Sequence, residues 1–137
     1  MNDLSLAMRI AASGMQAQSF RMRTVAENMA NADSTARTPD GEPYRRRVVS
    51  FRNELDRAVG ARLVRVDRVT QDRSEFRRRL DPQHPAADAE GYVQLPNVNS
   101  LIEAMDMRQA QRSYEANVSM IEIARNMVQR TIDILRG

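Results

Sequence analysis

The chain has 137 residues, the size of one domain, and its only aromatic residues are three Tyr and three Phe, so a large independent core is not expected. Cysteine is absent, which excludes disulfide bonds and thiolate metal sites. The net charge is +3, all 21 basic residues are Arg, and the excess lies between residues 34 and 96, where 13 Arg face 10 acidic residues. Arginine pairs with carboxylates in a planar geometry that suits polar contacts between subunits, and genomic base composition is the alternative reason for the absence of Lys.

The N-terminal segment is predicted to carry no cleaved secretory signal. Asp3 stands where a signal peptide would be basic, and Arg9 interrupts the apolar run that would follow. No stretch approaches the length that crosses a bilayer. We therefore expect a chain that is cytoplasmic or that leaves the cytoplasm by a route without a cleaved signal.

The first predicted element is a helix from about Asp3 to about Ala32. Its apolar and small residues recur at steps of four and three, the repeat that holds one helix against another. These positions are Leu4, Met8, Ala11, Met15, Gln18, Met22, Val25 and Met29. Gly14 costs about 1 kcal/mol relative to Ala inside a helix, and we expect it to leave a shallow surface where another backbone can approach closely; a merely tolerated glycine is the alternative. Asn31 and Asp33 are expected to end the helix, because their side chains compete with the helical backbone.

The second predicted element is a non-helical, β-rich insert from residue 34 to residue 96, which contains all five prolines. Residues 46–51 and 63–69 are predicted strands, the second with one apolar face formed by Val64 and Val66. Residues 53–59 between them fit either a helical turn or a polar hairpin. Residues 76–80 are expected to extend the sheet, followed by a loop and a short extended piece at residues 92–95.

The third predicted element is a long helix from about Ser100 to about Leu135 within the segment 97–137. One stripe of this helix is expected to pack on the first helix, and it comprises Tyr114, Asn117, Val118, Ile121, Ala124, Val128, Ile132 and Leu135. A second stripe lies beside it and comprises Ala116, Met120, Ile123, Met127 and Ile134. A single antiparallel partner covers only the first stripe, so the second is expected to contact a neighbouring subunit.

No catalytic motif is found in the sequence, and no cofactor is expected. The single His84 lies near Asp81, Asp88 and Glu90, which are possible metal ligands, but a loop without a second His favours a solvated structure over a metal site. There is no glycine-rich phosphate loop and no nucleophile elbow. An enzyme is therefore not expected.

Two binding functions are alternatives to an assembly subunit. The Arg triplets at residues 45–47 and 77–79, with aromatic residues alongside, could contact nucleic acid, although interspersed acidic residues lower the local potential. A membrane-surface helix is disfavoured, because both helical ends are neutral and poor in large apolar anchors. A packed assembly subunit remains the preferred interpretation.

Several segments resemble the flagellar rod and hook axial family. The terminal signatures are SGMQAQ at residues 13–18, AENMANADST at residues 26–35 and SYEANVSMIEIARNM at residues 113–127. The strings at residues 37–47 and 91–99 are most similar to the proximal rod members, while residues 48–90 match least. The chain departs from the hook and distal-rod members of the family after the first predicted helix, where it has Asp33-Ser34-Thr35 in place of their Thr-x-Gly-Tyr.

The resemblance implies a structural subunit of α+β class, with two long terminal helices packed antiparallel (1–33 and 97–137) around the insert 34–96. It implies helical assembly with further copies of the chain and with the rod subunits FlgB, FlgF and FlgG, the rod adaptor and the membrane-ring protein. It also implies export through the flagellar type III apparatus without a cleaved signal, and a place in the periplasmic part of the basal body. Nucleic acid is not among the implied partners, and membrane insertion is not implied.

Overall fold

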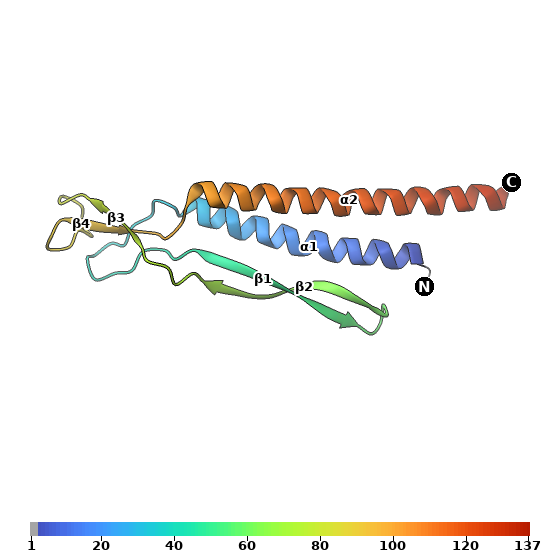
Figure 1. Ribbon diagram of the computed structural model, residues 1–137, viewed down its shortest axis with the longest axis horizontal. Helices are drawn as coiled ribbons and strands as arrows, with labels where there is room; N and C mark the ends of the chain where they lie inside the picture. Colours follow the sequence, from blue (N-terminus) through green and yellow to red (C-terminus); the bar gives the residue numbers. More distant parts are fainter. Residues whose placement is uncertain (1–2) are drawn as a thin grey trace.

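The computed structural model describes residues 3–137, so Met1 and Asn2 of the predicted segment 1–33 lie outside the described residues. The elements in chain order are α1 (Asp3–Ala30), β1 (Arg47–Asp56), β2 (Ala61–Gln71), β3 (Arg77–Leu80), β4 (Tyr92–Leu95) and α2 (Ser100–Arg136). Figure 1 shows an elongated molecule in which α1 and α2 run antiparallel, the β1–β2 hairpin lies along α1, and β3–β4 lies beyond the start of α2. The predicted α+β class with two long terminal helices is confirmed.

Local side-chain hydrogen bonds set the helix ends. The side-chain amide of Asn31 donates to the Glu27 carbonyl at 2.8 Å, and the Ser34 hydroxyl donates to the Asn31 carbonyl at 2.9 Å, so α1 ends two residues before the predicted Ala32. Asn99 caps α2, because its side-chain oxygen accepts from the backbone N–H groups of Leu101 and Ile102.

The β1–β2 hairpin includes residues 53–59, for which the sequence fitted either a helical turn or a polar hairpin. β1 continues to Asp56. The Asp56 carboxylate accepts hydrogen bonds from the backbone N–H groups of Ala58 and Val59 in the turn. Gly60 completes the turn with a φ of 76°, a conformation that favours glycine. The polar hairpin was therefore the right alternative.

The hairpin packs against α1, whereas the sequence analysis did not predict any contact between the insert and the helices. Ser13 of α1 donates to the Ile10 carbonyl and accepts the backbone N–H of Val64 at 3.1 Å. The most buried side chain of β2 is Leu63, which points to the opposite face from Val64 and Val66. Val64 and Val66 are both half-buried on the predicted apolar face, and the burial of Leu63 on the opposite face is what the sequence pattern did not predict.

The strands β3 and β4 form a sheet of their own. β3 pairs antiparallel with β4, from Arg77 opposite Leu95 to Leu80 opposite Tyr92. The expectation that residues 76–80 extend the first sheet is wrong, because Asp72 and Asn97 hold the intervening segment at the helix junction. The chain then turns back at Gly91, which has a φ of 89°.

The helix α2 is longer than its partner. Two contacts fix the antiparallel register of the helices: Asn28 donates a hydrogen bond to Glu103, and Gly14 packs on Asn117. Continued along both helices, this register places Asp3 opposite Val128. Residues 129–136 extend past the described start of α1 and are all exposed. The prediction that Ile132 and Leu135 pack on the first helix is therefore wrong, because α1 does not reach them within the described residues. Neither helix, over the part that the structure describes, is long and apolar enough to cross a membrane.

Candidate assembly surface

The packed face of α1 is rotated relative to the predicted heptad seam. Its buried residues are Ala11, Ser13, Gly14, Ala17, Thr24, Val25 and Asn28. These positions serve two neighbours, α2 on one side and the hairpin on the other. As a result, the large side chains of the predicted heptad seam are only partly covered. Leu4, Met8, Met15 and Met22 are half-buried, and Met29 is exposed.

Gly14 allows the closest approach between the two helices. A Cβ atom built on Gly14 would lie 2.8 Å from Nδ2 and 3.1 Å from Cγ of Asn117 in α2. Asn117 is itself held by a hydrogen bond from Nδ2 to the Ser113 carbonyl at 3.0 Å. The close neighbour of Gly14 is therefore a side chain of the same chain, and not the backbone that the sequence analysis expected.

We expect Gly14→Ala to have opposite effects in two backgrounds. In the natural chain it should lower the free energy of unfolding, because Asn117 must move. With Asn117→Ala the space is free, and the higher helix propensity of alanine should raise that free energy by about 1 kcal/mol. Urea unfolding followed by circular dichroism measures both values. Stabilisation by Gly14→Ala in both backgrounds would show that this contact is loose.

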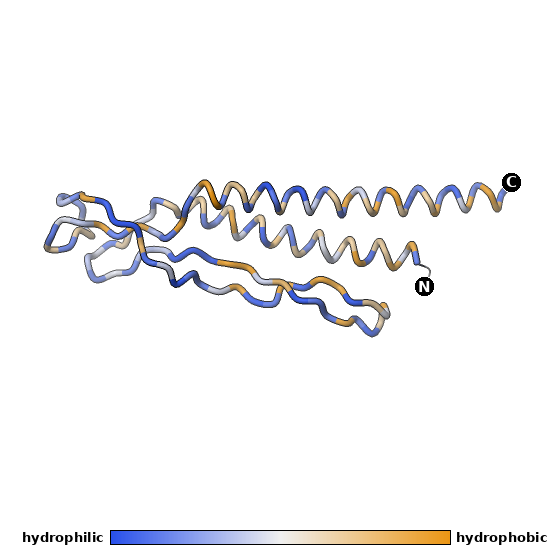
Figure 2. The backbone as a smooth tube through the Cα atoms, in the orientation of Figure 1, coloured by the Kyte–Doolittle hydropathy of each residue, from blue (hydrophilic) through white to orange (hydrophobic). Residues whose placement is uncertain are grey.

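The second stripe of α2 is exposed along the helix. Met120, Ile123 and Met127 are each about half exposed, and Ile134 is more so. The first stripe behaves differently, since Ala124 is buried and Tyr114, Val118, Ile121 and Val128 are half-buried. Figure 2 shows apolar positions recurring along α2 as far as its C-terminal end. An unpartnered apolar stripe of this length is typical of a surface that another chain covers.

A groove on the helical pair adds a second apolar surface. It has a volume of about 520 Å³, and it is lined by Ala12, Met15, Gln16, Ser19, Phe20 and Arg23 of α1 and by Tyr114 and Ile121 of α2. The lining is mainly apolar. None of the residues that line it in the described part of the chain is acidic, His or Cys. The groove therefore provides packing surface rather than chemistry.

A buried polar junction ties the helices to the hairpin. Asn28 of α1 pairs with the backbone of Arg47 through both amide atoms, since Oδ1 accepts the Arg47 N–H at 3.0 Å and Nδ2 donates to the Arg47 carbonyl at 2.9 Å. Asn28 also accepts the Tyr44 hydroxyl at 2.6 Å and donates to Glu103 at 3.2 Å. Burial raises the pKa of the Tyr44 phenol, which keeps this hydroxyl a donor.

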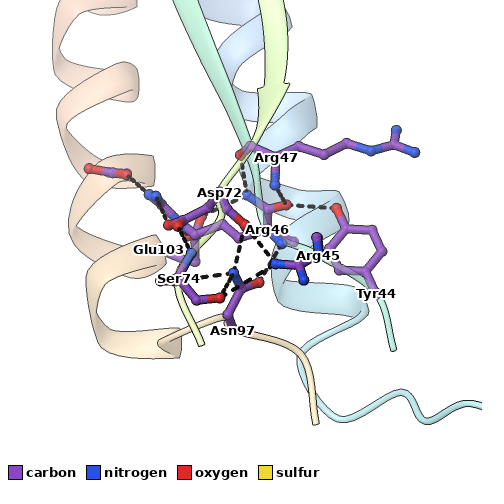
Figure 3. A network of polar contacts seen from close by, with 10 residues as sticks. Tyr44, Arg45, Arg46, Arg47, Asp72, Ser74, Asn97 and Glu103 are labelled. Atoms are coloured by element: carbon purple, nitrogen blue, oxygen red, sulfur yellow. Dashed lines mark hydrogen bonds and ion pairs between the residues drawn. The ribbon is translucent and has the colours of Figure 1, made fainter. Parts of the chain in front are cut away.

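Arg46 is the centre of the charged part of this junction (Figure 3). Its guanidinium bonds the fully buried Glu103, Asp106 at 3.1 Å and Asp72 at 3.5 Å. The Ser74 backbone N–H donates to the Asp72 carboxylate at 2.8 Å and holds the pKa of that carboxyl below its usual value. One arginine therefore joins α2 to the segment that leaves β2.

Asn97 completes the junction from the segment that enters α2. Its Oδ1 accepts the Arg46 N–H at 2.7 Å, and its Nδ2 donates to the carbonyls of Asp72 and Ser74 at 2.9 and 3.1 Å. The apolar periodicity of the sequence does not predict this cluster, because its members are polar and come from distant segments. The signal was nevertheless present: the three strings at residues 26–35, 37–47 and 91–99, which carry the family resemblance, each supply part of the junction.

The two Arg triplets are engaged within the chain. Arg45 stacks on Phe76 at 4.2 Å, Arg46 is held in the junction, and Arg47 pairs with Glu27. In the second triplet, Arg77 donates to the Ala32 carbonyl at 2.6 Å, and Arg78 pairs with Asp88 at 3.2 Å. Arg45 and Arg46 are mostly buried by these contacts, whereas the other four arginines of the triplets stay about half exposed.

His84 is also satisfied by its own chain. Nδ1 accepts the Ala86 N–H at 3.0 Å, and Nε2 lies 3.2 Å from the Thr35 hydroxyl. Both ring nitrogens are thus hydrogen-bonded, so His84 stabilises its loop. Across residues 3–137, no group of three or more His, Asp and Glu side chains is arranged to hold a metal ion.

Comparisons with known proteins point to one family. The family described as "Flagella basal body rod protein" matches residues 8–37, and the "Flagellar basal body rod FlgEFG protein C-terminal" family matches residues 89–134. The flagellar basal-body rod protein FlgC of Agrobacterium fabrum is 50% identical over 100% of this chain and 99% of its own length. The FlgC proteins of Borreliella burgdorferi and Bacillus subtilis are each 37% identical, over 95% and 93% of this chain and 96% and 95% of their own lengths. The chain therefore belongs to the FlgC family of flagellar basal-body rod proteins and is a structural rod subunit.

Proposed function

We propose that the chain polymerises helically through its terminal helices in the proximal part of the rod, between the membrane ring and the distal rod. The observation that carries this proposal is the exposed stripe of Met120, Ile123, Met127 and Ile134 on α2, which no described part of the chain covers. Helical growth requires heterologous contacts, in which the surface used on one side of a subunit differs from that on the other. The stripe and the α1–α2 groove are two such different surfaces.

The finer assignments rest on the family. The proposed partners are further copies of the chain, FlgB, FlgF and FlgG, the rod adaptor and the membrane-ring protein. Export is proposed to use the flagellar type III apparatus without a cleaved signal, and the assembled chain is proposed to lie in the periplasm. We propose that the chain performs no reaction, since the family is one of structural rod proteins. The paired Arg triplets give the nucleic-acid alternative no support.

The proposal is tested in cells that lack this chain. They are expected to be non-motile and to stop basal-body assembly at the membrane ring, and expression of the chain should restore both. The restored chain should be present in purified basal bodies, and it should stay in the cytoplasm when the type III apparatus is removed. Complete rods in cells without the chain would contradict the proposed function.

A further inference from the structure

The outer edge of β1 carries backbone groups that no described part of the chain binds. In an antiparallel pair, the N–H and C=O groups of one residue point to the same side of the strand, and that side alternates along the strand. Arg47 turns both groups away from β2, toward the side chain of Asn28. The bulge adds its extra residue to β2, so the alternation along β1 is unbroken. Phe51, Asn53 and Leu55 therefore also turn both groups away from β2, and none of these groups has a hydrogen-bond partner within residues 3–137.

This β1 edge, residues 51–55, faces away from the helices. Val64 of β2 stands opposite Asn53, and its N–H donates to the Ser13 hydroxyl of α1 at 3.1 Å. At this point α1 covers the outer edge of β2 and leaves the outer edge of β1 free. Leu55 is accordingly 53% exposed, whereas Leu63 of β2 is 5% exposed. In Figure 1, the end of β1 lies on the side of the hairpin away from both helices.

The β1 edge lacks the features that usually protect an edge strand. Proline, a bulge on the edge strand or charges of one sign normally prevent a further strand from pairing. β1 contains no proline, and the two charges within residues 51–55, Arg52 and Glu54, are of opposite sign. A lone two-stranded hairpin also gains stability when further strands join it. The edge is therefore suited to receive another strand.

The β1 edge is complementary to itself. When two copies run antiparallel with Asn53 opposite Asn53, the outward groups of residues 51, 53 and 55 can bond one another across the contact. Phe51 then stands opposite Leu55 of the second copy, and Arg52 stands opposite Glu54. Apolar pairs and pairs of opposite charge both stabilise neighbouring strands. The register centred on Arg52 would instead place two guanidinium groups opposite each other, so the register centred on Asn53 is preferred.

We propose that two unassembled copies of the chain pair through their β1 edges and form a four-stranded antiparallel sheet with two-fold symmetry. The occupant is a second copy because the edge matches itself in charge and in apolar pattern. Growth stops at two copies, because α1 covers the outer edge of β2 beside Val64. The contact is short, so the pair is weak and depends on concentration. A two-fold pair does not repeat along a filament whose subunits all point the same way, so the pairing holds the chain outside the rod.

Cysteine cross-linking of the purified chain tests the pairing, because the natural chain contains no cysteine. Asn53→Cys should give disulfide-linked dimers on mild oxidation, since hydrogen-bonded opposite residues have Cα atoms about 5.5 Å apart, within reach of a disulfide. Arg68→Cys, at an exposed position of β2, is the matched control and should give almost none. Asn53→Pro removes an outward N–H but no bond to β2. In sedimentation it should stay monomeric at concentrations where the natural chain pairs, with an unchanged circular dichroism spectrum.

Exchanging the charges gives a second readout that does not depend on folding. Arg52→Glu and Glu54→Arg are each combined with Asn53→Cys. Each variant alone places like charges opposite each other, so it should give roughly tenfold less linked dimer. A mixture of the two variants should restore linking, in dimers that contain one chain of each kind, because each variant supplies the charge that the other lacks.

Two results would overturn the inference. One is the absence of linked dimers from purified Asn53→Cys, and the other is equal linking in the mixture and in the separate charge variants. Linked dimers in oxidised basal bodies that contain Asn53→Cys would overturn the assignment of the pair to the unassembled chain. The pairing is measured on the purified chain, so its failure is distinct from a failure of the proposed function, which the motility of the same cells reports.

Discussion

Replacing Arg46 by methionine is expected to lower the free energy of unfolding by about 3–5 kcal/mol, because it leaves a buried carboxylate without its cation. Glu103 has no exposed surface, and Arg46 and Asn28 are its hydrogen-bond partners. A single domain is stable by only about 5–15 kcal/mol, so this loss is a large part of the total. Urea unfolding of the purified chain, followed by circular dichroism, measures it.

Two control variants separate the buried charge from a general effect of removing arginine. Arg68→Met removes an exposed pair with Asp67 and should cost no more than about 1 kcal/mol. Combining Arg46→Met with Glu103→Met removes both buried charges and should recover much of the lost stability. If Arg46→Met cost as little as Arg68→Met, the junction would not hold the hairpin to the helices.

Replacing Met127 by glutamate is expected to abolish rod assembly and motility while the protein is still made and exported. Met127 lies on the exposed stripe of α2, so the folded monomer tolerates a charge there. In a rod, the same charge would be desolvated in a subunit contact, which typically costs several kcal/mol unless it is paired, and every subunit repeats that cost. Motility, secreted protein and basal-body completeness are the three measurements.

Matched variants identify the cause. Asn126→Glu adds the same charge on the polar side of α2 and should leave motility intact. Val128→Glu places the charge on the half-buried first stripe, where it should reduce the stability of the soluble protein instead. Normal motility in cells with Met127→Glu would refute the assignment of the second stripe to a subunit contact.

The sequence predicts the helices and the strand cores well, because these depend on local periodicity. Residues 92–95 were predicted as an extended piece and form β4, and α2 differs from its predicted bounds by one residue. The separate β3–β4 sheet could not be predicted, because it depends on which distant segments meet. Asp72 and Asn97 decide that pairing, and nothing in the local pattern around residues 76–80 indicates it.

The candidate surface was predicted only in part. The separation of the two stripes of α2 follows from helical geometry, and their burial in the chain differs as expected. The packed face of α1 was misplaced, because a heptad describes one partner helix, whereas α1 contacts both α2 and the hairpin. The exposure of residues 129–136 was not predicted for another reason: how far α2 extends past α1 depends on the register between the helices, which Gly14 and Asn28 set.

The central claim is that the exposed stripe of α2 is a contact between rod subunits. Cryo-electron microscopy of purified basal bodies tests it most directly, at a resolution that shows side chains in the rod. The claim predicts that Met120, Ile123 and Met127 lie against a neighbouring subunit and are excluded from solvent. A rod in which these three side chains face solvent, while other residues make the subunit contacts, would contradict it.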